Sequence, residues 1–88
     1  MPWFVKIESG IVDKPTFDRY VEAHKDYVRS LIDRGHGAKT GYWAERGGGM
    51  LIFQAKSLAE AEAIVASDPL VQSHCVTYQL HEWTIVVE

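Results

Sequence analysis

The chain has 88 residues, of which 47% are hydrophobic and 24% charged, and its formal net charge is −3. This composition is typical of a single globular domain over residues 1–88 and excludes a disordered chain. The interspersed negative charge disfavours nucleic acid or an anionic membrane as a partner, and no apolar run approaches the ~20 residues of a membrane span.

Cysteine use also restricts the kind of domain. Cys75 is the only cysteine, so no internal disulfide can support a core of this small size. We therefore expect good packing, or a partner subunit, to supply the missing stability. A single thiol, with an N-terminus unlike a signal sequence, predicts a cytoplasmic location. No zinc-binding spacing is present, and we expect neither a metal nor an organic cofactor.

The first half of the chain reads as a strand, a helix and a second strand. Residues 3–8 alternate between two faces, Trp3, Val5 and Ile7 on one and Phe4, Lys6 and Glu8 on the other. This alternation is typical of a strand. An apolar stripe at helical spacing begins at Phe17 and predicts one long helix that ends at Gly35. Residues 36–44 are predicted as the second strand.

The second half supplies a hairpin, a helix and a closing strand. Glycines at 47–49 predict the hairpin connection, and residues 50–55 the third strand. Ser57 with Glu60 matches a capping box that opens a second helix, which runs to about Ser67. Asp68-Pro69 should interrupt that helix. Residues 76–87 are predicted as one long strand, with a bulge near His81-Glu82 where the apolar phase shifts.

This order of elements predicts an α+β fold, the ferredoxin-like βαββαβ sandwich, with both helices on one face of a four-stranded antiparallel sheet. The third strand is apolar on both faces, because Met50 and Ile52 alternate with Leu51 and Phe53. A half-exposed strand would alternate with polar residues instead. We therefore expect a homodimer through the open sheet face, with Phe4 and Trp43 adding to that surface.

Two residues stand out as candidates for chemistry. His24 lies within the apolar stripe of the first helix, and Asp68 ends the second helix. Because both helices pack on the same sheet face, the two side chains can meet, and a carboxylate beside an imidazole fixes its tautomer and raises its basicity. Each also has a structural reading, His24 as a core histidine bonded to a carbonyl and Asp68 as a cap of the next turn.

The remaining histidines and the cysteine carry weaker signals. Of His36, His74 and His81, none has the i, i+4 spacing of a metal pair on a helix. A metal site assembled from distant strands stays open as a less favoured alternative. Cys75 follows His74 directly, so on a strand their side chains face opposite ways and do not form a nucleophile–base pair.

Several segments in a fixed order carry a family resemblance. They are His24 in the first helix, Thr40-Gly41, Met50–Ile52, the helix that starts at Ser57, Asp68–Val71 and the closing Glu82-Trp83. In this order the chain resembles the YciI-like (YCII-related) family. The resemblance implies a dimeric α+β barrel with a pocket near the paired His24 and Asp68. It also implies chemistry without a cofactor, and dehydrochlorinase-like lyase activity is one activity known in the family.

The leading hypothesis is a small-molecule enzyme of lyase or isomerase type. His24 would act as general acid or base, and Asp68 would orient it. The aromatic pocket residues suggest a flat ligand, and the expected substrate-binding residues are Tyr42, Trp43, His74 and Tyr78. The alternative is a non-catalytic ligand-binding or accessory dimer, in which His24 and Asp68 form a buried structural pair.

An RNA-binding domain shares the same order of elements. The RNA-recognition motif requires aromatic residues on its third strand that stack on bases. Here Gly48 and Met50 stand at two of those positions. The stacking platform is therefore missing, and together with the negative net charge this disfavours RNA as a ligand.

Overall fold

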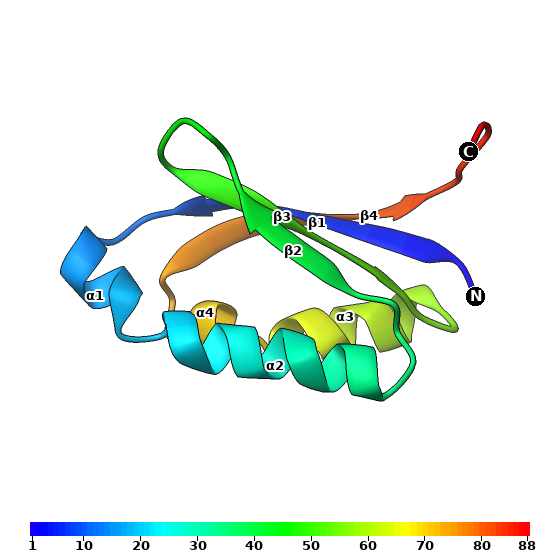
Figure 1. Ribbon diagram of the computed structural model, residues 1–88, viewed down its shortest axis with the longest axis horizontal. Coiled ribbons are helices and arrows are strands. Elements are labelled where there is room, and N and C mark those ends of the chain that lie inside the picture. The colour runs from blue at the N-terminus through cyan, green and yellow to red at the C-terminus, as the bar shows by residue number, and fades with distance from the viewer.

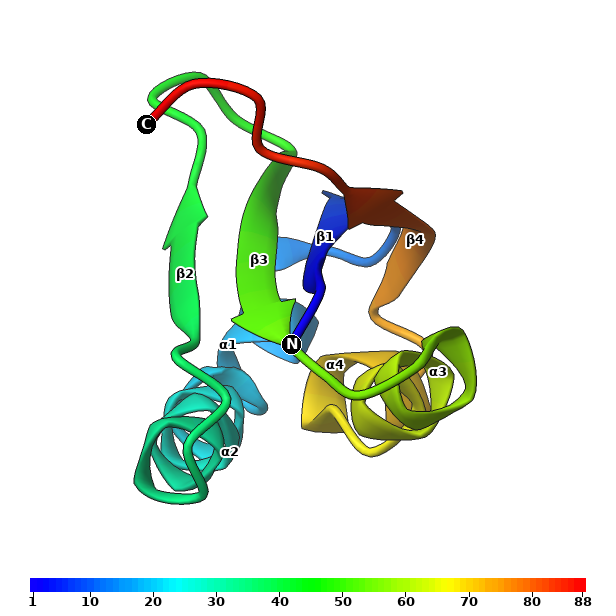
Figure 2. The same cartoon turned by 90° about the vertical axis from the view of Figure 1, so that its right-hand side faces the viewer.

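The computed structural model describes residues 1–88 and consists of one sheet covered by helices on one side (Figures 1 and 2). The strands are β1 (Trp3–Gly10), β2 (Lys39–Tyr42), β3 (Gly48–Gln54) and β4 (Val76–Trp83). The helices are α1 (Lys14–Asp18), α2 (Val21–Asp33), α3 (Leu58–Ala66) and α4 (Pro69–Gln72). No helix is long and apolar enough to cross a membrane. The antiparallel strand order β2-β3-β1-β4 is that of a ferredoxin-like sandwich, which confirms the predicted α+β fold.

The first helical segment differs from the prediction. One continuous helix to Gly35 is wrong, because the chain forms α1 and α2 with a break at Arg19 and Tyr20. In the break, each of these two amides bonds to the carbonyl three residues earlier, which tightens the turn. The tightened turn separates residues that pack on two different clusters. Val28 and Leu31 of α2 belong to the main core. Phe17 and Tyr20 pack on a small second cluster, formed by Leu70, Cys75 and Val76.

The second strand and the last strand are both shorter than predicted. β2 covers only residues 39–42, since Gly37 before it adopts a positive φ of 59° that no regular strand contains. β4 pairs with β1 without interruption, from Trp3 opposite Trp83 to Gly10 opposite Val76. The predicted bulge at His81-Glu82 is therefore wrong. The apolar phase shifts because Leu80 lies opposite Lys6 on the inward face, whereas Trp83 lies opposite Trp3 on the open face. Residues 84–88 then leave the sheet on the side away from the helices (Figure 1).

Helix α3 follows its sequence signals closely. The Ser57 hydroxyl accepts a hydrogen bond from the amide of Glu60 (3.1 Å) and so caps the first turn. The helix ends at Ala66, and Asp68 then caps the short helix α4, which begins at Pro69. This new start places the Asp68 side chain beneath the sheet.

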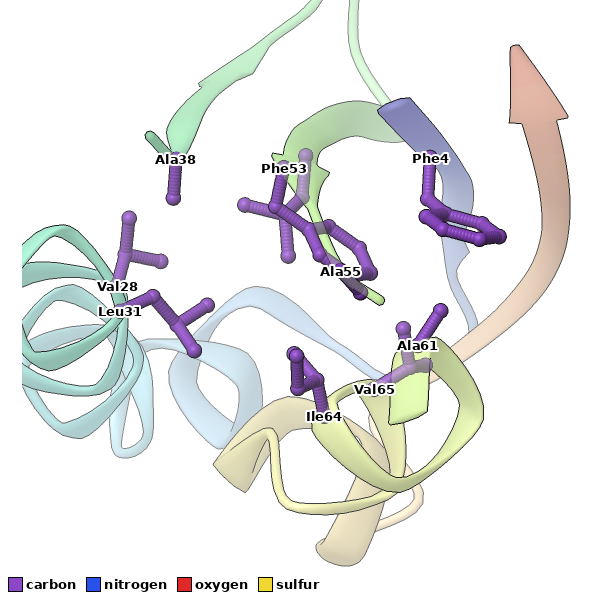
Figure 3. Packing of buried hydrophobic residues seen from close by; sticks show 10 residues of the cluster. Phe4, Val28, Leu31, Ala38, Phe53, Ala55, Ala61, Ile64 and Val65 are labelled. Carbon is purple, nitrogen blue, oxygen red and sulfur yellow. The ribbon is translucent and has the colours of Figure 1, made fainter. Parts of the chain in front are cut away.

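The core lies between the sheet and helices α2 and α3 (Figure 3). Phe4 and Phe53 stack at its centre with their ring centroids 5.9 Å apart. Helix side chains such as Leu31 and Ile64 point toward them from below. The prediction that Phe4 belongs to the open face is wrong, because the inward face of β1 carries Phe4, Lys6 and Glu8, all of them buried.

The opposite face of the sheet has no helix over it (Figure 2). It carries the outward residues of the two central strands, Val5 and Ile7 from β1 and Met50 and Ile52 from β3. With Trp83 they line an apolar depression of about 360 Å³. A second depression, of about 300 Å³, lies over β2 and shares Met50 and Ile52 with the first. The sheet is thus apolar on both faces, as the third strand indicated.

Candidate active site

His24 and Asp68 are in contact beneath the sheet. His24 lies one turn before Val28 on the inward side of α2, and only 8% of its surface is exposed. Its Nδ1 lies 2.9 Å from Oδ1 of Asp68, the N-cap of α4. An ionised carboxylate can only accept a hydrogen bond, so Nδ1 is the donor. The predicted meeting of these two side chains is confirmed.

The Asp68 carboxylate is held by three groups and is itself fully buried. Its Oδ1 also accepts a hydrogen bond from the amide of Leu70 (2.9 Å), and its Oδ2 accepts one from Nζ of Lys6 (2.6 Å). Burial alone would raise the pKa of Asp68, but the hydrogen bond from His24 and the charge of Lys6 outweigh it and hold the pKa below its usual value. Asp68 is therefore ionised at neutral pH.

Lys6 extends this contact to a second carboxylate. Its side chain is fully buried, and its Nζ lies 3.4 Å from Oε2 of Glu8 and 5.8 Å from the ring centroid of Tyr78. Oε2 of Glu8 is buried without a hydrogen-bond partner. Neither Lys6 nor Glu8 is among the site residues predicted from the sequence. The sequence does contain a signal for them, because Lys6 and Glu8 share one face of the predicted strand with the apolar Phe4.

The other ring nitrogen of His24 faces the edge of the sheet. Nε2 lies 3.4 Å from Oγ1 of Thr40 in β2, and that hydroxyl donates a hydrogen bond to the backbone oxygen of Met50 (3.3 Å). Because the single ring proton of the neutral imidazole is on Nδ1, bonded to Asp68, Nε2 carries a lone pair, and the Thr40 oxygen can accept from Nε2 once the ring is protonated. Thr40 also contributes to the lining of the depression over β2, beside Lys39. It lies opposite buried Leu51, so its hydroxyl faces inward, toward His24.

Tyr27 supports the pair from the same helix. Its ring centroid lies 6.2 Å from that of His24, and its hydroxyl donates a hydrogen bond to the backbone oxygen of Ile64 in α3. Burial, followed by the charge of Asp68, raises the pKa of Tyr27 far above its usual value. Tyr27 is thus a neutral donor that ties α2 to α3 beside His24.

The expected substrate-binding residues do not form one pocket. Tyr42 (90% exposed) and Trp43 line the depression over β2. Tyr78 lies in β4, at the opposite edge of the sheet, with Lys6 beside its ring. His74 is exposed in the turn before β4, where it adopts a positive φ of 58°. Only Tyr42 and Trp43 therefore share an opening with Thr40.

The remaining candidates have structural partners. Nδ1 of His36 lies 2.7 Å from the backbone oxygen of Gln54 and donates to it, and buried Cys75 accepts a hydrogen bond from Ser73 (3.1 Å). His81 lines the depression on the open face. No group of three His, Cys, Asp or Glu side chains is arranged to hold a metal ion.

Comparisons with known proteins relate the chain to a solved structure and to a protein family. Among solved structures, the chain is similar to 5-chloro-2-hydroxyhydroquinone dehydrochlorinase from Burkholderia phenoliruptrix AC1100, which was solved in complex with 2,5-dihydroxybenzoquinone. The TM-score is 0.58 at 18% identity, over 91% of this chain and 93% of the other, so the likeness is one of fold. No curated protein sequence matches the chain. The model of the YCII-related domain matches residues 12–84, and the chain belongs to the YCII-related domain family.

Proposed function

We propose that this protein is a small-molecule enzyme of lyase or isomerase type that works without a cofactor, with His24 as its acid/base. The observation that carries the proposal is the buried contact of His24 with Asp68, which leaves Nε2 as the free basic atom next to Thr40. A base held in this way removes a proton from a carbon atom of the substrate. Returning the proton at another position isomerises the substrate, whereas loss of a leaving group completes an elimination.

The family and the fold support this class of chemistry. The structural neighbour is named as a dehydrochlorinase and holds a cyclic hydroxylated ligand. In this chain the aromatic residues Tyr42 and Trp43 line the depression that Thr40 borders. A flat, cyclic, hydroxylated molecule is therefore the ligand class to test first.

The experiment compares His24→Gln and Asp68→Asn with the wild-type protein. Chloride release from 5-chloro-2-hydroxyhydroquinone tests elimination, and deuterium uptake from solvent into hydroxylated cyclic probes tests isomerisation. Because general acid–base catalysis contributes about 10²–10⁴-fold, His24→Gln should lower turnover by about 100-fold or more with the fold retained. His36→Gln is the matched control, since His36 bonds to a backbone oxygen, and it should keep full turnover.

The competing reading is a ligand-binding dimer in which the pair is structural. The observation in its favour is the complete burial of Asp68 and Lys6, since removing one partner from a buried ion pair destabilises a protein strongly. Under this reading, His24→Gln and Asp68→Asn lower stability, and the wild-type protein binds the probes without converting them. That combination of results would contradict the enzyme proposal.

A homodimer through the open sheet face is part of the proposal. The outward residues Val5, Ile7, Met50 and Ile52 form an apolar surface with two depressions on it. An exposed apolar surface of this kind is typical of an interface. Packing two such faces together would enclose both depressions and give the shared interior of an α+β barrel. The cytoplasmic location predicted from the single thiol remains part of the same proposal.

A further inference from the structure

All four buried polar side chains of this protein belong to one connected network. They are Lys6, Glu8, His24 and Asp68. The network runs from Glu8 to Lys6 (3.4 Å), from Lys6 to Asp68 (2.6 Å) and from Asp68 to His24 (2.9 Å). Buried charge is costly unless it is paired. Its concentration at one place therefore points to a role beyond general packing.

Lys6 cannot be a group that touches the substrate. Its side chain is fully buried, and its contacts are Asp68, Glu8 and the ring of Tyr78. Any effect of Lys6 on chemistry therefore passes through Asp68. Nζ of Lys6 donates a hydrogen bond to Oδ2 of Asp68, while Oδ1 accepts hydrogen bonds from Nδ1 of His24 and the amide of Leu70.

The charge of Lys6 matters because Asp68 has two ways to bond to His24. An ionised Asp68 accepts a hydrogen bond from Nδ1–H of His24, and Nε2 then has a lone pair. A neutral Asp68 would keep a proton of its own and donate a hydrogen bond to Nδ1, and the neutral imidazole would then hold its ring proton on Nε2. Burial favours the neutral acid, and the ammonium group of Lys6 at 2.6 Å opposes this effect.

We propose that Lys6 is a positioning residue that keeps Asp68 an ionised acceptor and thereby holds His24 in the tautomer whose Nε2 can take up a proton. Glu8 serves Lys6 in turn, because its carboxylate at 3.4 Å balances an ammonium group that is removed from water. The ionisable groups that act on Asp68 are Lys6 from β1 and His24 and Tyr27 from α2, and Glu8 contacts Lys6. The inference rests on the proposed acid/base role of His24.

The tautomer of His24 can be read directly from long-range ¹H–¹⁵N spectra of the labelled protein, at a pH where histidine is neutral. His24→Gln assigns the signal. The test variants are built on Glu8→Gln, so that replacing Lys6 leaves a single buried carboxylate. Glu8→Gln alone is the matched control, and like the wild-type protein it should show the proton on Nδ1. Lys6→Met on this background should invert the majority tautomer to Nε2–H.

Lys6→Gln on the same background separates charge from hydrogen bonding. Glutamine keeps an N–H donor for Oδ2 of Asp68 but carries no charge, so the inversion to Nε2–H should appear here as well. A folded Lys6 variant that keeps the proton on Nδ1 would overturn the inference. The same holds for a wild-type protein with Nε2–H, or for loss of the fold with both replacements of Lys6, because Lys6 would then be purely structural.

This readout is independent of turnover. If the tautomer inverts in a protein that converts no probe, the positioning role of Lys6 stands while the proposed function fails. If His24 is needed for turnover but its tautomer does not depend on Lys6, the proposed function stands and this inference fails.

Discussion

Two neighbouring residues of β3 offer a matched test of the proposed dimer. Ile52 points to the open face and Phe53 to the core. Glutamate at either position introduces the same charge, one residue apart on the same strand. We expect Ile52→Glu to dissociate the dimer without unfolding the chain, and Phe53→Glu to unfold it.

The expected magnitudes follow from the two environments. Phe53 is fully buried, and loss of such a ring costs about 3–5 kcal/mol, to which an unpaired buried carboxylate adds several more. An 88-residue domain has a total stability of about 4–13 kcal/mol, from ~0.05–0.15 kcal/mol per residue. Ile52 lies opposite Lys39 on the same face, so a glutamate there gains a cation and should change monomer stability by about 1 kcal/mol or less.

In a face-to-face dimer, Ile52→Glu would instead place two carboxylates in the apolar interface. A cost of about 3 kcal/mol corresponds to a roughly 100-fold higher dissociation constant. Sedimentation measures the mass against the 10.0 kDa monomer, and far-UV circular dichroism reports the fold. A wild-type monomer at micromolar concentration, or an Ile52→Glu protein that remains a dimer, would refute the proposed interface. A folded Phe53→Glu monomer would refute the assignment of the two faces.

Three further predictions concern the network and its support. Lys6→Met and Asp68→Asn should each lower the free energy of unfolding by about 3–5 kcal/mol. The double variant should lose less than the sum of the two, since the second change removes a charge that already lacks its partner. Urea denaturation measures these free energies, and additive losses would contradict the contact between Lys6 and Asp68. Because the pKa of Asp68 is lowered on folding, its stabilisation is complete above the unfolded value of 3.8 and is lost as the pH falls through the folded value. Asp68→Asn should therefore flatten the loss of stability at acid pH, and an unchanged urea midpoint profile would argue against it. Tyr27→Phe should cost about 0.5–1.5 kcal/mol, because the carbonyl of Ile64 loses one of its two donors and keeps the amide of Ser67, and thermal unfolding should show a melting temperature lower by about 2–12 °C.

The order of elements and the bounds of α3 could be predicted because their signals are local. Ser57 caps the helix through the amide of Glu60, and Asp68-Pro69 ends it, and both act within a few residues of their own position. The contact between His24 and Asp68 could also be predicted, because it follows from placing two helices on one sheet face. The residue pattern does not determine whether His24 and Asp68 act on a substrate or only stabilise the fold.

The faces of β1 could not be predicted in the same way. Alternation shows that Phe4, Lys6 and Glu8 share a face, but not that this face is the buried one. Lysine and glutamate favour the outside unless they find partners, and the partner of Lys6 lies 62 residues further along the chain. The break of the first helix has a similar origin, because Tyr20 turns toward a cluster formed by residues of α4 and β4.

The position of β1 between β3 and β4 has a consequence for the order in which the protein can assemble. β1 is synthesised before β3 and β4, yet it pairs with both of them, and Lys6 of β1 bonds to Asp68, which lies 62 residues later. Such distant pairings make folding slow compared with a helical bundle, because the loop must close before the contact forms. On the ribosome, the contact between His24 and Asp68 can therefore form only after α3 and Asp68 have emerged, and a product truncated before Asp68 would lack the partner of both Lys6 and His24.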